Sequence, residues 1–325
     1  MRHGGRWLAP GFLAVLLVAC SALPQRPATG PALWEVSDPA SGSRLWLFGT
    51  IHRLADSSLW RASFVERVFQ STRTDRAIPP LPWVTPAVQK ALATSRTIVL
   101  ETTFIENDTW VGDALGMLPD ERRPLRELLA AERYERLAAA GRAYGIAEQH
   151  LDDASPLAAL FLFTFIASTP DAETQIGVEY WLERYARRRH LALVGLESIA
   201  ERIGALRSTM AGLEVQRQCE ILLHYVADAL SDPAAERGAL RELLALWQTG
   251  DIATLDSDLH RFAEAHPEIH QALIIARNHL WLERLAALIV SGRREFVAVG
   301  VGHLVGPGNL LDLLAERGFT VHRVQ

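Results

Sequence analysis

The chain has 325 residues, with 33 basic and 38 acidic side chains, and its formal net charge at pH 7 is −5. A protein that binds nucleic acid would be expected to carry a net basic charge, so we expect no nucleic-acid partner. The two cysteines, Cys20 and Cys219, are too few for a disulfide-rich scaffold. The fold must therefore depend on an apolar core, and the chain is long enough to bury one.

The first residues have the layout of an exported protein's leader. Arg2 and Arg6 supply positive charge, and residues 8–18 are mostly apolar but too few to span a bilayer. Residues 17–20 read Leu-Val-Ala-Cys, which resembles the bacterial lipobox, in which the cysteine sulfur is acylated after export. The alternatives are an ordinary secretory signal with an incidental Cys20, or a short N-terminal membrane anchor.

From this layout we predict a lipoprotein signal peptide over residues 1–19, a flexible tether over residues 20–31 and one domain over residues 32–325. A lipid on Cys20 would make the membrane a partner of the protein. Because Ser21 and not an aspartate follows that cysteine, the pattern resembles sorting to the outer membrane. We therefore expect an exported protein, lipid-anchored in the bacterial cell envelope and facing the periplasm.

The N-terminal third after the tether is predicted to be β and then α/β. Residues 32–36 and 44–48 are short apolar runs joined by turn residues, which indicates a hairpin. Residues 86–94 have helical character, with Thr85 placed as the N-cap and proline at the first helical position. Residues 97–100 form a β-branched run that suits a buried strand.

The middle of the chain is predicted to be long and helical, with one further buried strand over residues 191–196. Residues 157–166 are apolar all round but too few to span a membrane, so we interpret them as a buried core helix. The other helical segments are residues 124–141 and 178–188, residues 199–264 with three or four helices, and residues 267–290 with one or two.

The end of the chain returns to α/β. Residues 295–299 read as a strand, residues 306–317 as a loop and helix that stops at Gly318, and residues 320–324 as a last strand. Strands at both ends of a helical middle predict an α/β (α+β) fold. Its central sheet would be built from N- and C-terminal strands, with a large helical insertion.

Two apolar strands each run into a Gly-x-x-His motif, at Gly49 and His52 and again at Gly300 and His303. Each glycine would let the chain turn sharply where the strand ends. Each histidine would then stand in an exposed loop beyond the carboxyl end of a strand, the edge of an open α/β sheet where ligands bind. A single such motif is weak, but two on similar strands predict a shared site.

Two other predicted strands run into glutamates, Glu101 and Glu197, so four strands would deliver two imidazoles and two carboxylates to one edge of the sheet. These groups are common ligands of Zn, Mn, Co or Fe, and without metal they could act as general acids and bases. The competing interpretation is that the histidines are ordinary loop residues and the glutamates cap helices. For Glu197 this alternative is serious, because Ser198 and a helix follow directly.

These segments together resemble the TraB/GumN family, which is related in pattern to the Tiki proteases and to the group containing erythromycin esterase and ChaN. The resemblance covers almost the whole domain, in order. It rests on residues 33–36, 45–52, 81–101, 177–198, 276–278 and 296–324.

The resemblance implies a fold like those of erythromycin esterase and ChaN, and a metal-dependent hydrolase, most often proposed to be a peptidase. It implies a divalent metal held by His52, His303 and Glu101. Glu101, Glu197 and Arg277 are the catalytic candidates, and a peptide or a small molecule is the expected substrate. Two positions depart from the family pattern. Thr103 stands where a second acidic residue is usual, and Glu201 stands near a usual glutamine.

Two alternatives stay open. The guanidinium of Arg277 could bind a substrate carboxylate or an oxyanion, or it could form a salt bridge to a neighbouring helix. The protein itself could be a non-catalytic binding protein that holds a metal, haem or peptide at the same site. Cys219 is expected to be an inert buried thiol. His266 and His270 have helical spacing but lack a metal motif, so we interpret them as part of a polar helix–loop junction.

Overall fold

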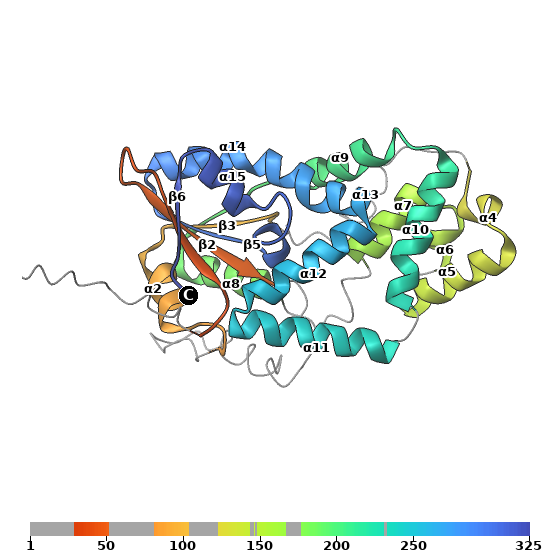
Figure 1. The fold of residues 1–325 in the computed structure, drawn as a ribbon, viewed down its shortest axis with the longest axis horizontal. Coiled ribbons are helices and arrows are strands. Elements are labelled where there is room, and N and C mark those ends of the chain that lie inside the picture. The colour runs from red at the N-terminus through yellow and green to blue at the C-terminus, as the bar shows by residue number, and fades with distance from the viewer. Residues whose placement is uncertain are drawn as a thin grey trace, which may run out of the picture.

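The computed structural model describes residues 29–51, 81–103, 123–143, 146, 148–166, 177–230 and 233–325, and the predicted leader and Cys20 lie outside this part of the chain. Its strands form one six-stranded sheet in the order β4-β3-β5-β2-β1-β6 (Figure 1). The strands are β1 (Leu33–Ser37), β2 (Arg44–Thr50), β3 (Thr97–Leu100), β4 (Ala192–Gly195), β5 (Glu295–Gly300) and β6 (Thr320–Arg323). The sheet joins both ends of the chain, which confirms the predicted α/β class.

Four of the strands run parallel to one another. β5 pairs with β2 on one side and with β3 on the other, and β3 pairs with the edge strand β4. β1 and β6 are added antiparallel to their neighbours. In this register Thr50 lies opposite Gly300, so the strands that lead into both Gly-x-x-His motifs end at the same edge of the sheet. We call this edge the carboxyl rim. His52 itself lies outside the described residues.

Side chains alternate between the two faces of the sheet, as strand geometry requires. Phe48 and Phe296 pack on one face against helices α2, α8, α11 and α12, whereas Leu47 and Val297 pack on the other against α14 and α15. Figure 1 shows α14 and α15 on the side of the sheet away from α2 and α8. These helices are α2 (Pro86–Thr94), α8 (Val178–Arg189), α11 (Pro233–Thr249), α12 (Ile252–Ala265), α14 (Ala276–Ser291) and α15 (Leu310–Glu316).

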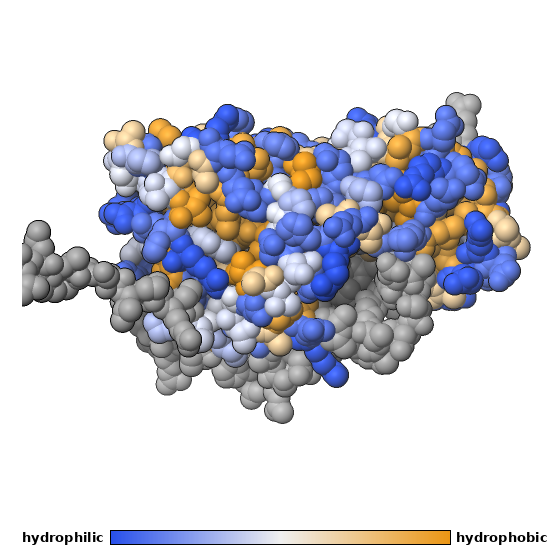
Figure 2. Space-filling model, in the orientation of Figure 1, coloured by the Kyte–Doolittle hydropathy of each residue, from blue (hydrophilic) through white to orange (hydrophobic). Residues whose placement is uncertain are grey.

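The remaining helices form a second core beside the sheet, labelled at the right of Figure 1. They are α4 (Leu125–Leu128), α5 (Ala131–Ala143), α6 (Glu148–Asp152), α7 (Pro156–Phe161), α9 (Ile199–Met210), α10 (Val215–Leu230) and α13 (Pro267–His270). On the face shown in Figure 2 hydrophilic residues surround scattered hydrophobic ones, as expected when helices turn their apolar sides inward.

The apolar segment 157–166 is a buried helix, as predicted. α7 begins behind the N-cap Ser155 and continues as a π-helical turn, Leu162–Ile166. Leu157, Leu160 and Phe161 are almost completely buried. Across the part of the chain that the structure describes, every helix is too short or too polar to cross a bilayer.

The helix at 86–94 and its cap also agree with the prediction. α2 starts at Pro86, and the Thr85 hydroxyl oxygen accepts a hydrogen bond from the backbone N–H of Val88 at 3.3 Å. This hydroxyl satisfies one of the amides that have no partner inside the first turn.

Several predictions differ from the structure. The segment 191–196 was expected to be a buried strand, but β4 is an edge strand in which Ala192 and Val194 are exposed, because only its other face is packed. The segment 124–141 divides into α4 and α5, since the backbone of Leu129 is extended (φ −103°, ψ 146°). The segment 267–290, by contrast, agrees with the expectation of one or two helices, since α13, a π-helical turn (Gln271–Ile275) and α14 follow one another without a break.

The junction at His266 is not the polar helix–loop junction that the sequence indicated. Helix α12 runs directly into α13 there, and His266 and His270 are both buried. The ring of His266 packs against the rings of His224, Tyr225 and Phe262. The contacts of these rings are therefore part of core packing. Cys219 is a buried free thiol whose pKa is raised by burial, as expected of an inert cysteine.

Candidate functional site

The two predicted glutamates meet at the carboxyl rim because the β3–β4 ladder continues past the ends of both strands. The backbone N–H of Leu196 donates to the carbonyl of Leu100 at 2.7 Å, and that of Glu197 donates to the carbonyl of Glu101 at 2.8 Å. Both glutamate side chains are buried, at 3% and 4% residue exposure. Two adjacent buried carboxylates are costly unless cations compensate them.

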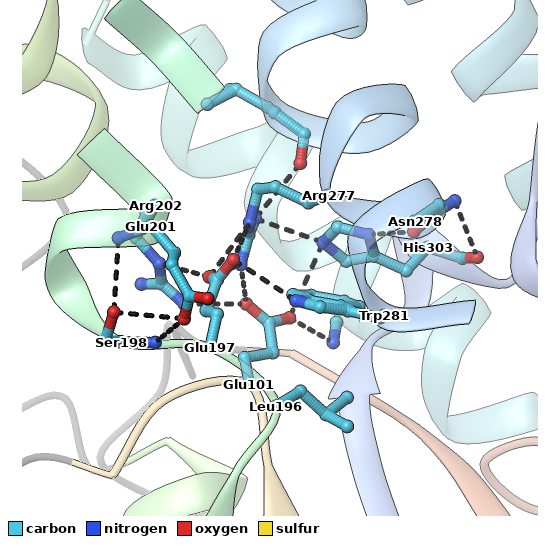
Figure 3. A network of polar contacts seen from close by, with 12 residues as sticks. Glu101, Leu196, Glu197, Ser198, Glu201, Arg202, Arg277, Asn278, Trp281 and His303 are labelled. Carbon is cyan, nitrogen blue, oxygen red and sulfur yellow. Dashed lines mark hydrogen bonds and ion pairs between the residues drawn. The ribbon is translucent and has the colours of Figure 1, made fainter. Parts of the chain in front are cut away.

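Arg277, in the first turn of α14, supplies one of these cations (Figure 3). Its Nη2 donates to Glu101 Oε2 at 2.5 Å and to Glu197 Oε1 at 2.7 Å, and its Nε donates to Glu197 Oε1 at 3.0 Å. Its Nη1 contacts the carbonyl of Leu273 at 3.0 Å and Nε2 of His303 at 3.2 Å. A guanidinium has five N–H donors, and each one here has an acceptor. Arg277 is therefore a clamp that holds the two carboxylates and the histidine together.

Arg202 on α9 is a second clamp, which the sequence analysis did not single out. Its Nε donates to Glu197 Oε1 at 2.7 Å and its Nη2 to Glu101 Oε2 at 3.0 Å. Two guanidinium groups thus face two carboxylates, and their formal charges cancel. The only signal in the sequence was that Arg202 lies in the first turn of the helix that follows Glu197.

The two arginines respond differently to this shared setting. Burial would lower the pKa of Arg277, but the charges of Glu101 and Glu197 outweigh burial and raise it. For Arg202, burial and the nearby charge of Arg277 lower the pKa in spite of the same two carboxylates. Arg277, whose five N–H groups all have acceptors, therefore keeps its charge in this buried setting.

His303 follows β5 in a short 3₁₀ turn (Val301–His303) and is held by Asn278. The Asn278 Nδ2 donates to the carbonyl of Gly308 at 2.8 Å, which orients the amide so that its Oδ1 lies 2.6 Å from His303 Nδ1. Nδ1 must therefore carry the proton, which leaves Nε2 of the neutral ring as an acceptor. The donor Nη1 of Arg277 faces that atom.

His303 is only 3% exposed, and its ring packs on Trp281 with 4.3 Å between ring centroids. The sequence predicts an exposed loop at this position. That expectation is wrong because the start of α14 covers the end of β5, so the histidine contributes to packing as well as to the site. Trp281 also donates its Nε1–H to Glu197 Oε2 at 3.2 Å, which joins the ring to the carboxylates.

Neither motif glycine has a positive φ, so the conformational freedom that the sequence predicts for them is not used. Gly49 instead permits a close approach, because a Cβ there would lie 3.2 Å from the Val301 side chain, which would have to shift by a few tenths of an ångström. The backbone N–H of Gly300 donates to Glu101 Oε1 at 2.7 Å. The second motif therefore helps to orient the first glutamate.

His303 Nε2 and Glu101 Oε1 lie 3.7 Å apart at the centre of this cluster. An imidazole nitrogen whose other nitrogen donates to an oxygen, beside a carboxylate oxygen, is the donor chemistry of many divalent-metal sites. In donor type, these residues fit the expected metal. The described residues contain no group of three or more His, Cys, Asp or Glu side chains arranged to hold an ion. The third expected ligand, His52, lies outside them.

Glu201 lies outside the cluster and has a structural role. Its side chain and that of Ser198 form a capping box at the start of α9, and it pairs with Arg284 of α14. Ser198, and not Glu197, is therefore the cap that the alternative interpretation proposed. The hydrogen bond from Arg284, together with that from the Ser198 backbone N–H, lowers the pKa of Glu201 to about 2 from an ordinary 4.5.

A depressed carboxyl pKa stabilises the folded state above the unfolded-state pKa, and this stability is lost as the pH falls toward 2. The Glu201 side chain is 37% exposed, so solvent screening leaves a contribution of about 1 kcal/mol. We expect Glu201→Gln, which retains the capping geometry, to lower the free energy of unfolding by this amount at pH 7 and much less near pH 2. Urea unfolding at both pH values measures it, with the exposed Glu242→Gln as the control. An equal loss at both pH values would contradict this origin.

Fold and site together define an α/β protein with a buried carboxylate–arginine–histidine cluster at the carboxyl ends of its parallel strands. The sequence profile of the TraB/PrgY/gumN family matches residues 79–323, and the chain belongs to this family. The matched region contains Glu101, Glu197, Arg277 and His303 but begins after His52. No curated protein and no solved structure matches the chain.

Proposed function

We propose that the chain is a metal-dependent hydrolase, peptidase-like, that acts at the carboxyl rim. The observation that carries this proposal is the pair formed by His303 Nε2 and Glu101 Oε1. The nitrogen has its lone pair fixed by Asn278, and the oxygen lies 3.7 Å away in a buried setting. Both atoms belong to the residues that the family resemblance implies as metal ligands, with His52 as the third.

In this proposal the residues of the chain have distinct tasks. His303 and Glu101 would hold the divalent ion, Mn, Co, Zn or Fe, and Asn278 would keep the imidazole in the tautomer that can do so. Arg277 would keep Glu101 ionised and in place, and would give up its contact with His303 Nε2. A divalent metal would supply polarisation of a substrate carbonyl and activation of water.

The charge balance of the cluster limits how it binds a metal. Two glutamates are already neutralised by two arginines, so a dication would bring excess positive charge into a buried site. An anionic group from solvent or substrate would offset that excess. We therefore expect the metal to bind more tightly when a carboxylate-containing peptide is present than when the protein is alone.

The remaining expectations belong to the same proposal. The chain would be exported and lipid-anchored at Cys20, facing the periplasm, and its substrate would be a peptide or a small molecule. Incorporation of labelled palmitate, and its loss in Cys20→Ser, tests the anchor separately from the chemistry.

The experiment for the activity uses the full chain. We expect Mn, Co, Zn or Fe to raise its melting temperature, because a ligand that binds only the folded state stabilises it. The same ion should permit cleavage of a peptide library, and a chelator should stop it. Melting curves and mass spectra of the library, with and without each ion, give both results.

One observation favours the non-catalytic alternative. Every N–H of Arg277 and both oxygens of Glu197 already have partners, so much of the cluster is closed. A rim that holds a peptide, haem or metal without reacting would need no free catalytic group. If no ion shifts the melting temperature and no peptide is cut, the metallohydrolase proposal fails and this alternative stands.

A further inference from the structure

The opposite edge of the sheet, at the amino ends of the parallel strands, carries a row of arginines. Trp46 and Ile98 both pair with Phe296. Two residues before each of these three positions stands an arginine. Arg44 begins β2, Arg96 directly precedes β3 and Arg294 directly precedes β5, and we call these three residues the arginine row. All three are exposed, and the backbone N–H of Arg96 donates to the carbonyl of Arg294 at 3.0 Å. Adjacent strands lie about 4.8 Å apart, so the backbones of these three arginines lie side by side.

The segments next to the row add more positive charge. Helix α8 ends at Arg189 just before β4, and Arg293 precedes the row's Arg294. All of these side chains are exposed. Glu35 pairs with Arg44 at 3.2 Å.

Two other carboxylates near the row face elsewhere. Asp38 accepts hydrogen bonds from Ala40 and Ser41 inside the β1–β2 turn. Glu295 is 1% exposed, and burial raises its pKa, which favours the uncharged form. Like charges at this spacing repel one another in the free protein, so an anionic partner would be favoured.

An exposed apolar side chain lies beside the same arginines. Val290, in the last turn of α14, is 59% exposed, and Arg293 and Arg294 follow within four residues. A basic edge with an exposed apolar residue suits the interface of a bilayer better than the purely polar backbone of a nucleic acid. The backbone at Arg294 is unusual, since its φ is +60°, a conformation that L-residues rarely adopt.

We propose that this edge of the sheet binds the surface of a bilayer that contains anionic phospholipids. The arginines of the row and its flanks would contact lipid phosphates, and Val290 would enter the interface. β2 has seven residues and so spans about 23 Å, which separates this edge from the carboxyl rim. The protein would therefore rest on the membrane with its candidate site turned away from it. This inference does not depend on the proposed chemistry.

The test compares the full chain on vesicles of phosphatidylcholine with and without phosphatidylglycerol, and it measures hydrogen exchange. We expect residues 38–44, 187–192 and 290–296 to exchange at least about threefold more slowly on the anionic vesicles, because bound lipid covers them. High salt should remove this protection. Because the comparison is between two lipid compositions, an N-terminal lipid anchor does not alter its meaning.

A variant with Arg96→Gln, Arg293→Gln and Arg294→Asn should lose the protection, and its affinity for anionic vesicles should fall more than about tenfold. The matched control removes three exposed arginines from the helical part, by Arg133→Gln, Arg136→Gln and Arg207→Gln. It should keep the protection, although its net charge changes equally. Equal exchange on both vesicle types would overturn the proposal. Protection by duplex DNA but not by anionic vesicles would also overturn it, and would assign the edge to nucleic acid.

Discussion

Arg277→Met is expected to lower the free energy of unfolding by about 3–5 kcal/mol, because it leaves two buried carboxylates facing a single guanidinium. The hydrogen bonds of all five N–H groups of Arg277 disappear together, and Glu197, with a side chain that is 0% exposed, has no access to water as a substitute. The melting temperature should fall by about 10 °C. Urea unfolding followed by circular dichroism measures both changes.

Two further variants show whether geometry or charge alone matters. Arg277→Lys keeps the charge but not the planar fork, so it should recover less than half of the loss. Arg261→Met removes an exposed arginine that pairs with Asp258, and it should cost less than about 1 kcal/mol. If Arg277→Met lowers the free energy of unfolding no more than this control does, then Arg277 does not offset the charges of the two buried carboxylates.

His303→Ala is expected to abolish the metal-dependent rise in melting temperature and to reduce any hydrolysis at least about 100-fold. It removes the imidazole nitrogen that is proposed to bind the ion at the carboxyl rim. It should also cost about 2 kcal/mol in the metal-free protein, because the ring is buried on Trp281 and bonded to Asn278.

His279→Ala is the matched control, since His279 is exposed on the same turn of α14 as Asn278. It should leave stability, metal response and hydrolysis unchanged. Melting curves with and without metal, together with peptide cleavage, separate the two roles of His303. A full metal response in His303→Ala would remove this residue from the proposed site, whatever its effect on packing.

The sequence predicted the fold well where local signals were strong. The cap at Thr85, the proline after it and the β-branched run at 97–100 placed α2 and β3 correctly. The two Gly-x-x-His strands were correctly expected in one sheet, because similar strands that end alike favour a common edge. β4 was misjudged, since an apolar run reads the same at the edge of a sheet as at its centre.

The site was predicted in composition but not in its bonding. Strand ends marked Glu101, Glu197 and His303, and the family resemblance marked Arg277. Arg202 was missed because an arginine in a helix is ordinary in a sequence, and only the packing of α9 on the carboxyl rim brings it to the carboxylates. The burial of His303 was missed for a similar reason, since its cover comes from α14.

The pairing of β2 with β5 also has a consequence for how the chain folds. Trp46 and Phe296 are partners 250 residues apart, and β5 forms the middle of the sheet between β2 and β3. Contacts between residues so far apart in the sequence are slow to form, because a long loop must close before they contribute to stability. On a ribosome β2 would wait until β5 had been made. The centre of the sheet therefore stays incomplete while all the residues between β2 and β5 are synthesised.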